Sequence, residues 1–221
     1  MPIKSRVQWK YLKAYHPKIF ERFQKENPIN YKDLPERISK IQGGNIAGED
    51  ISLSEDDLRR LLPGVKIVSY PDLEKYKSLE ELLYPNDEVI ILYLKRLKDG
   101  SYDESYGHWV GLFRNKGIVS FFDSYGGKPD DYKQIEPYLS KLLLDYSERK
   151  NVPIEYNDHQ FQKWEPDIAT CGRHTAMRIA FKDLPLKDYI YLFKDTPKFD
   201  SDEIVTALTQ RDNEGGCECE Q

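Results

Sequence analysis

Residues 107–126 read GHWVGLFRNKGIVSFFDSYG, and this stretch decides the fold that we predict from the sequence. Two apolar runs flank Asn115-Lys116-Gly117, whose composition is typical of a tight turn. We therefore predict an antiparallel hairpin. His108 and Asp123 then lie near the same end of the two strands, so that a carboxylate comes within reach of an imidazole.

The sequence on either side of the hairpin contains further strand and helix patterns. Ser54 is a suitable helix N-cap because its hydroxyl can accept a backbone N–H, and three acidic residues follow it. Residues 98–106 are polar and are predicted as a loop. The fold class is therefore α+β, with a central, mostly antiparallel sheet flanked by helices. The predicted strands are 66–70, 88–94 and 153–157, and the predicted helices are 54–62, 130–150, 171–181, 186–193 and 201–210.

Chain length and proline positions predict one folded domain with two appendages. The 221 residues suffice for one sizeable domain. Residues 1–50 have helical spacing that prolines interrupt, and we expect a helical N-terminal extension there. Residues 51–211 form the folded domain, and residues 212–221 form a flexible tail.

The composition argues against several classes of function. The longest apolar run, residues 89–94, is too short to cross a bilayer. No apolar signal-peptide core follows the basic N-terminus, so we expect no membrane partner and a cytosolic location. The net charge of -5 argues against attraction of the whole protein to nucleic acid, although a local basic patch over residues 4–18 leaves that question open.

Three cysteines occur in the chain, Cys171, Cys217 and Cys219. Two of them lie in the tail, which excludes a disulfide framework and indicates a reducing compartment. Cys217-Glu218-Cys219 has no neighbouring histidine and no second cysteine pair, so we predict no metal site and leave the role of these two cysteines open. We likewise predict no cofactor.

Cys171 is the cysteine with a chemical context. It opens a predicted helix, whose dipole favours the thiolate, and Gly172 permits close approach of a substrate. An isolated cysteine is more often a buried structural residue. His108 and Asp123 change that interpretation, because a thiol, an imidazole and a carboxylate are the parts of an activated cysteine nucleophile. His174 is predicted to pack or to cap the helix instead.

Four segments resemble those of a known family: Gly107-His108-Trp109, Phe121–Gly126, Gln162 and Thr170–His174. In this order they resemble the viral maturation cysteine proteases related to the adenovirus protease (adenain), in particular virophage and giant-virus members. These enzymes share a papain-like fold with the proteases of ubiquitin-like modifiers. The resemblance covers residues 50–195 and implies that residues 51–211 are a cysteine protease domain.

The resemblance implies a role for each residue of these segments. His108 would be the general base, Asp123 the group that orients it, and Cys171 the nucleophile. The backbone N–H groups of Cys171 and Gly172 would contribute to the oxyanion hole. Trp109 would support the substrate groove.

A glutamine side chain would complete the oxyanion hole. In the family this glutamine lies six or seven residues before the cysteine, where this chain has Trp164 and Glu165. The stretch Tyr156–Gln162 resembles the family's sequence around the glutamine and favours Gln162, with Gln160 as the alternative.

The resemblance implies a cysteine endopeptidase that cleaves viral capsid precursors at Gly-x or Gly-Gly sites during virion maturation. Its partner would be a protein substrate, and it would act in the virion and in the viral factory of the host cytoplasm. One alternative is an isopeptidase that removes ubiquitin-like modifiers, and another is a non-catalytic virion protein with the same fold. The natural substrate, any peptide or DNA activator and the oligomeric state stay open.

The segment Ile41-Gln42-Gly43-Gly44-Asn45 has two interpretations. It resembles the cleavage pattern of the family, an aliphatic residue two positions before Gly-Gly, which would place a self-cleavage site between Gly44 and Asn45. The other interpretation is a flexible linker.

Overall fold

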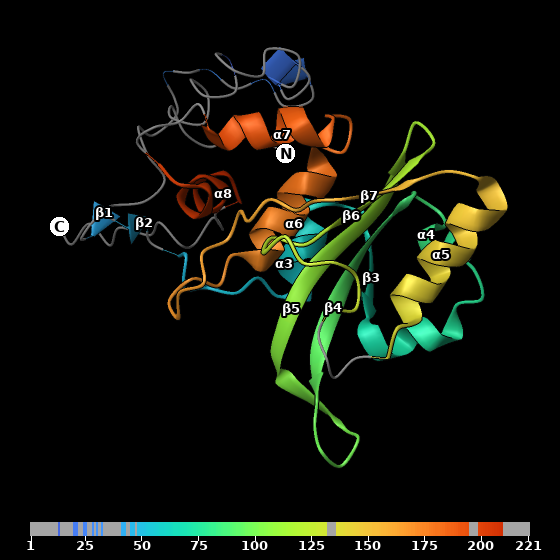
Figure 1. Ribbon diagram of the computed structural model, residues 1–221. Helices are drawn as coiled ribbons and strands as arrows, with labels where there is room; N and C mark the ends of the chain where they lie inside the picture. The colour runs from blue at the N-terminus through green and yellow to red at the C-terminus, as the bar shows by residue number, and fades with distance from the viewer. Residues whose placement is uncertain are drawn as a thin grey trace.

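The computed structural model describes residues 48–131, 136–194 and 199–209, together with scattered positions before residue 48 (Figure 1). The tail that holds Cys217 and Cys219 and most of the predicted N-terminal extension lie outside the described residues. The strands are β1 Ile41–Gln42, β2 Asn45–Ile46, β3 Lys66–Ser69, β4 Glu88–Arg96, β5 Tyr102–Asn115, β6 Ile118–Phe122 and β7 Ile154–Tyr156. The helices are α3 Glu55–Leu61, the 3₁₀ helix η2 Tyr70–Lys75, α4 Leu79–Leu83, α5 Tyr138–Lys150, α6 Cys171–Ala180, α7 Leu186–Lys194 and α8 Ser201–Thr209.

The main sheet has five strands in the order β3-β4-β5-β6-β7. The central strands β4, β5 and β6 pair antiparallel, whereas the edge strands β3 and β7 pair parallel with their neighbours. The predicted hairpin is present, with Asn115 opposite Ile118. Lys116 and Gly117 both have positive φ, 50° and 83°, which is the backbone of a two-residue turn that matches the twist of the strands.

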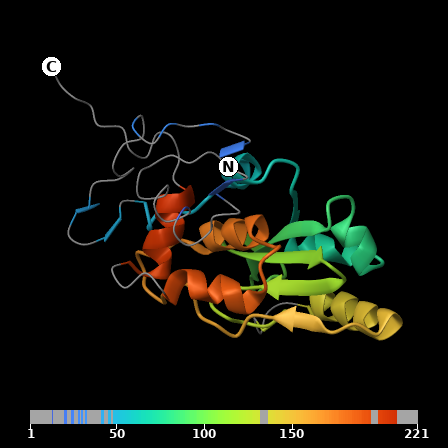
Figure 2. The same cartoon turned by 90° about the horizontal axis from the view of Figure 1, so that it is seen from above.

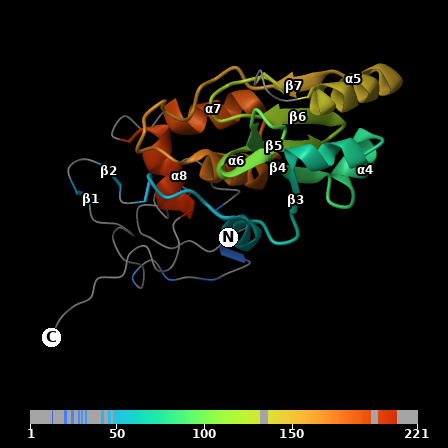
Figure 3. The same cartoon turned by 90° about the horizontal axis from the view of Figure 1, so that it is seen from below.

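Helices cover both faces of this sheet, which confirms the predicted α+β class. On one face, η2, α4 and α5 enclose a core that contains Leu73, Leu82 and Leu143. On the other face, α3 and α6 enclose a second core that contains Leu58 and Ile179. Figures 2 and 3 show α7 and α8 grouped with α6 on one side of the sheet, and α5 on the other.

Two predicted boundaries were wrong. Residues 98–106 are not all loop, because β5 begins at Tyr102 and extends the pairing with β4 beyond a register shift after Leu94. The predicted helix 130–150 begins only at Tyr138. Pro137 occupies its N-cap, a position that does not require a backbone N–H, whereas proline inside a helix would disrupt it.

The start of α3 agrees with the sequence prediction. The Ser54 side chain accepts the Asp57 N–H, and the Asp57 carboxylate accepts the Ser54 N–H at 3.0 Å, which completes a capping box. Among the described residues, no helix is long and apolar enough to cross a membrane.

Candidate active site

Cys171 is the first residue of α6, directly after the N-cap Thr170. Its side chain is 8% exposed and packs in the core between α6, α3 and the sheet. The backbone N–H groups of Trp109 and Gly172 lie near its sulfur and contribute to lowering the pKa of the thiol. A thiolate here gains both from these donors and from the positive end of the helix dipole.

His108 and Asp123 meet at the end of the hairpin, as the strand pattern predicted. The His108 Nε2 lies 2.8 Å from the Asp123 Oδ1, and the Cys171 thiol is close enough to the imidazole to raise its pKa. The three side chains therefore form one connected series of thiol, imidazole and carboxylate. Asp123 is 1% exposed, so its carboxylate acts on the imidazole with little screening by water.

This series favours an ion pair between thiolate and imidazolium. Burial alone would lower the pKa of His108, but its hydrogen bonds with Asp123 and Cys171 outweigh burial and raise that pKa well above its usual range. Burial alone would raise the pKa of Cys171, but the hydrogen bond and positive charge of His108 outweigh it and lower that pKa. The thiolate is the nucleophilic form of cysteine.

A tight turn after β6 holds the Asp123 carboxylate in place. The Gly126 N–H donates to the Asp123 carbonyl at 2.9 Å, and the Tyr125 N–H donates to Asp123 Oδ1 at 2.9 Å. Gly127 is packed against the other carboxylate oxygen, because a Cβ on Gly127 would lie 2.7 Å from Asp123 Oδ2. The turn thus fixes the carboxylate from two sides.

Asn157 is a supporting residue whose contacts sequence reasoning did not find. Its Oδ1 accepts the Asp123 N–H at 2.9 Å, and its Nδ2 donates to the Asp123 carbonyl at 2.7 Å. The residue directly follows β7, which pairs with β6, so the two strand ends place it beside Asp123. The signal available in the sequence is the Tyr156-Asn157 pair, to which the family resemblance assigns no role beyond locating a glutamine.

Gln162 and Gln160 occupy different environments. The Gln162 side chain is 2% exposed, accepts the Ser124 hydroxyl at 2.8 Å through Oε1, and donates to the Ile168 carbonyl at 3.1 Å through Nε2. An amide nitrogen carries two hydrogens, so one donor remains for a bound group. Gln160 is exposed and folds back onto the Gln162 carbonyl. The environment of Gln162 is the one that suits a fixed donor.

Trp109 and Gly172 are in contact beside the thiol. The Trp109 Nε1 donates to the Leu53 carbonyl at 3.0 Å, which fixes the indole. A Cβ on Gly172 would lie 3.0 Å from the Trp109 Cδ1, so the glycine permits the close approach of α6 to β5.

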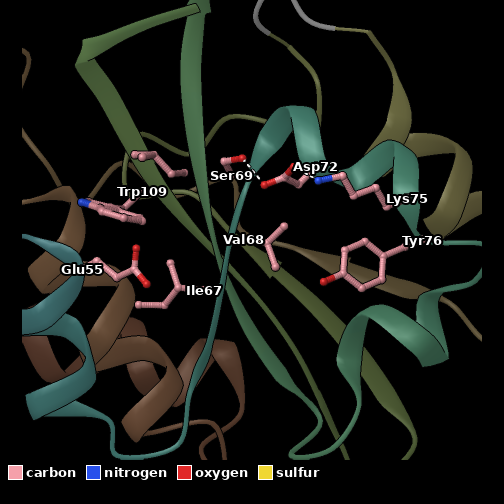
Figure 4. A pocket seen from close by; sticks show the side chains of 9 residues that line it. Glu55, Ile67, Val68, Ser69, Asp72, Lys75, Tyr76 and Trp109 are labelled. Carbon is pink, nitrogen blue, oxygen red and sulfur yellow. Dashed lines mark hydrogen bonds and ion pairs between the residues drawn. The ribbon is translucent and has the colours of Figure 1, made fainter.

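Trp109 also lines a surface cavity of about 360 Å³ (Figure 4). Its apolar lining comes from Ile67, Val68, Tyr76, Leu92 and Trp109, and its polar lining from Glu55, Ser69, Asp72 and Lys75. Figure 4 shows the polar residues Ser69, Asp72 and Lys75 joined by hydrogen bonds and an ion pair along one side of the cavity.

His174 lies one helical turn after Cys171 but packs in the core, in agreement with its prediction. It is fully buried, and its Nε2 lies 3.0 Å from Asp202 Oδ1 on α8. Gly44 lies outside the described residues, and Asn45 begins β2, which pairs with β1. Within the described part of the chain, no group of three or more histidine, cysteine or acidic side chains could hold a metal ion.

The structural comparisons give a low likeness to a viral protease. The crystal structure of the ASFV pS273R protease matches with a TM-score of 0.42 and 12% identity, covering 95% of this chain and 90% of that one. The Se-Met form of the same protease matches with a TM-score of 0.42 and 10% identity, covering 94% and 90%. Likeness at this level does not by itself identify a fold family.

The sequence comparisons give a clearer result. No model of a known protein family matches the chain. The uncharacterized protein V9 of Sputnik virophage is 35% identical over 178 residues, which cover 73% of this chain and 95% of the relative. The chain therefore belongs to the family of Sputnik virophage protein V9.

Proposed function

We propose that this protein is a cysteine endopeptidase in which Cys171 is the nucleophile, His108 the general base and Asp123 the residue that orients the base. The observation that carries the proposal is the 2.8 Å contact between His108 and Asp123, together with a thiol at a helix N-terminus that interacts with the same imidazole and has a lowered pKa. A buried structural cysteine would need neither partner.

The proposed reaction is amide hydrolysis through a thioester. The Cys171 thiolate attacks the scissile carbonyl, and the negative charge on its oxygen is held by the backbone N–H groups of Cys171 and Gly172 and by the Gln162 amide. The His108 imidazolium gives its proton to the leaving amine as the C–N bond breaks. Water then attacks the thioester, His108 takes the proton of that water, and the thiolate is released.

The proposed substrates are viral structural precursors cleaved at Gly-x or Gly-Gly sites. The preference for glycine next to the scissile bond is carried over from the resemblance of the four site segments to the family. The apolar side chains that line the cavity with Trp109, namely Ile67, Val68 and Leu92, suit an aliphatic side chain of the substrate. The relative from a virophage is consistent with action in the virion and the viral factory.

The first test is cleavage of a peptide that contains Ile-Gln-Gly-Gly-Asn. The wild type should cleave it after the second glycine, and Cys171→Ala and His108→Ala should both lose the activity. The matched control is His174→Gln, which alters the other buried histidine. Retained cleavage in Cys171→Ala would contradict the proposal.

The same proteins separate the two alternatives. An isopeptidase would leave the peptide intact but react at Cys171 with a ubiquitin-like modifier that carries a C-terminal electrophile. A non-catalytic protein would react with neither.

Self-cleavage between Gly44 and Asn45 is a further part of the proposal. Sequencing the N-terminus of the incubated wild type should give Asn45, and Cys171→Ala should keep its original terminus. An unchanged wild-type terminus would leave that segment as a linker.

A further inference from the structure

Three aromatic rings stand in a row from the active site to the surface. The Tyr125 ring stacks on the His108 imidazole, with 5.1 Å between the centroids and 27° between the planes. The Trp164 indole stacks on Tyr125, with 3.7 Å and 11°. Trp164 is 68% exposed, although it is a large apolar side chain.

The segment that carries Trp164 is anchored at both of its ends. At its start, the Lys163 N–H donates to Asp202 Oδ2 at 3.0 Å, and the Lys163 ammonium lies 2.5 Å from the Asp200 carboxylate. At its end, the Ile168 N–H donates to the Glu165 carbonyl, and the Ile168 carbonyl accepts the Gln162 amide. The stack therefore rests on a fixed loop.

Hydrogen bonds alone do not restrain every rotation of an imidazole ring. The bond to Asp123 fixes the direction of one ring nitrogen, but the ring can still tilt about that direction. A second ring against its face opposes the tilt. Tyr125 supplies that ring, and its own N–H donates to the same Asp123 oxygen, so both restraints converge on one carboxylate.

We propose that Trp164 is a positioning residue: by covering the outer face of Tyr125, it holds the phenol ring against His108 and so keeps the imidazole in line with Cys171 and Asp123. This inference rests on the proposed function of that site. Trp164 touches neither the thiol nor the scissile bond in this scheme, and it acts through Tyr125.

The test is the pH dependence of Cys171 alkylation by iodoacetamide, which needs no substrate. In the wild type the reaction should stay fast at pH 6, where an ordinary thiol is protonated. Trp164→Ala should lower the rate at pH 6 by about three- to tenfold, the range that an aromatic contact supports. At pH 9, where ordinary thiols ionise, the rates should agree within about twofold.

Three further variants complete the design. Trp164→Phe keeps a flat ring and should recover most of the rate at pH 6, whereas Trp164→Leu should not. Tyr191→Ala removes an aromatic side chain of similar exposure, 50%, from α7 and should match the wild type. The melting temperature should change by at most a few degrees in any variant, because these side chains are largely exposed. If Trp164→Ala fails to fold, Trp164→Leu decides.

Two results overturn the inference in different ways. A wild type with an ordinary thiol profile removes both the proposed function and the role of Trp164. A wild type that alkylates rapidly at pH 6, with Trp164→Ala and Trp164→Leu both unchanged, leaves the proposed function in place and removes the role of Trp164 alone.

Discussion

Two histidine–aspartate pairs of nearly equal geometry occur among the described residues, and only one has the surroundings of an active site. His108 lies 2.8 Å from Asp123, and His174 lies 3.0 Å from Asp202. The first imidazole is 11% exposed, and the neighbouring Cys171 thiol contributes to its raised pKa. The second pair is fully buried, and no thiol contacts it among the described residues.

The His174–Asp202 pair holds both ends of the loop between Gln162 and Cys171. Asp202 accepts the hydroxyl of Thr170, the residue before Cys171, and the N–H of Lys163, the residue after Gln162. Its bonds from His174 and Thr170 outweigh burial and lower the pKa of Asp202 below its usual range. A histidine and an aspartate at bonding distance therefore specify a catalytic pair only when a nucleophile and an open side accompany them.

The largest effect should separate the two histidines. His108→Ala should lower peptide cleavage by about 10³-fold, since a general base contributes that much, with little change in melting temperature. His174→Ala should destabilise the protein by about 2–4 kcal/mol, because it empties a buried site and leaves Asp202 without one partner. Cleavage assays at 15 °C and thermal unfolding measure the two effects.

The distinction between the two pairs is contradicted if His108→Ala and His174→Ala lose cleavage to the same extent. If a folded His174→Ala protein cleaves the peptide as poorly as His108→Ala does, the proposed assignment of the catalytic role to His108 and Asp123 is contradicted. His108→Gln, which keeps a polar side chain of similar volume, serves as the control for cavity effects at the first site.

The next effect concerns the Asp202 carboxylate. Asp202→Asn should cost about 3 kcal/mol at pH 7, because the amide brings a donor where Lys163 and Thr170 already donate. The pKa of Asp202 is lower in the folded protein than in the unfolded chain. The carboxylate therefore contributes its full stabilisation above the ordinary aspartate pKa of about 4, and this stabilisation is lost as the pH falls through the lowered pKa.

Urea unfolding between pH 3 and pH 7 measures this difference. The gap between wild type and Asp202→Asn should narrow toward pH 3. A gap that stays constant would mean that Asp202 contributes by packing and not by its charge. Asp188→Asn, a change at an exposed carboxylate of α7, is the control.

Local patterns in the sequence predicted the first pair but not what supports it. The turn at Asn115-Lys116-Gly117 sets the hairpin register, and the register brings His108 to Asp123. Asn157 reaches Asp123 through the parallel pairing of β6 with β7, which no adjacent residues encode.

The second pair and the aromatic stack were equally inaccessible to sequence reasoning. His174 and Asp202 lie 28 positions apart on different helices, and each alone reads as an ordinary helix residue. Trp164 stands where the family resemblance predicts the glutamine. The resemblance therefore selects Gln162 for the oxyanion hole and assigns no role to Trp164. Contacts between distant segments depend on packing, which periodicity and spacing do not specify.

A smaller effect on cleavage tests how the turn after β6 holds Asp123 beside His108. Gly127→Ala should lower cleavage by about tenfold, because the new Cβ, 2.7 Å from Asp123 Oδ2, displaces the carboxylate that orients His108. Gly117→Ala is the matched control: its site is open but its φ is 83°, so it should cost stability and spare cleavage. Equal cleavage losses in the two variants would point to a general loss of folding.

The smallest expected effect on cleavage concerns Glu49, which lies near the acidic residues around the His174–Asp202 pair. It tests whether these charges affect only stability. Glu49 is 4% exposed, and burial first, then Asp200, Asp202 and Glu203, raise its pKa from 4.5 to about 7. Because the folded carboxyl keeps its proton to higher pH than the unfolded one, its ionisation costs stability that is absent below pH 4.5 and grows up to about pH 7. Glu49→Gln should therefore stabilise the protein at pH 8, where the wild-type carboxyl is ionised, and leave its stability unchanged near pH 4. Cleavage by the variant should match the wild type at every pH, and a shift in the pH profile of cleavage would show that this acidic cluster reaches the Cys171–His108 pair.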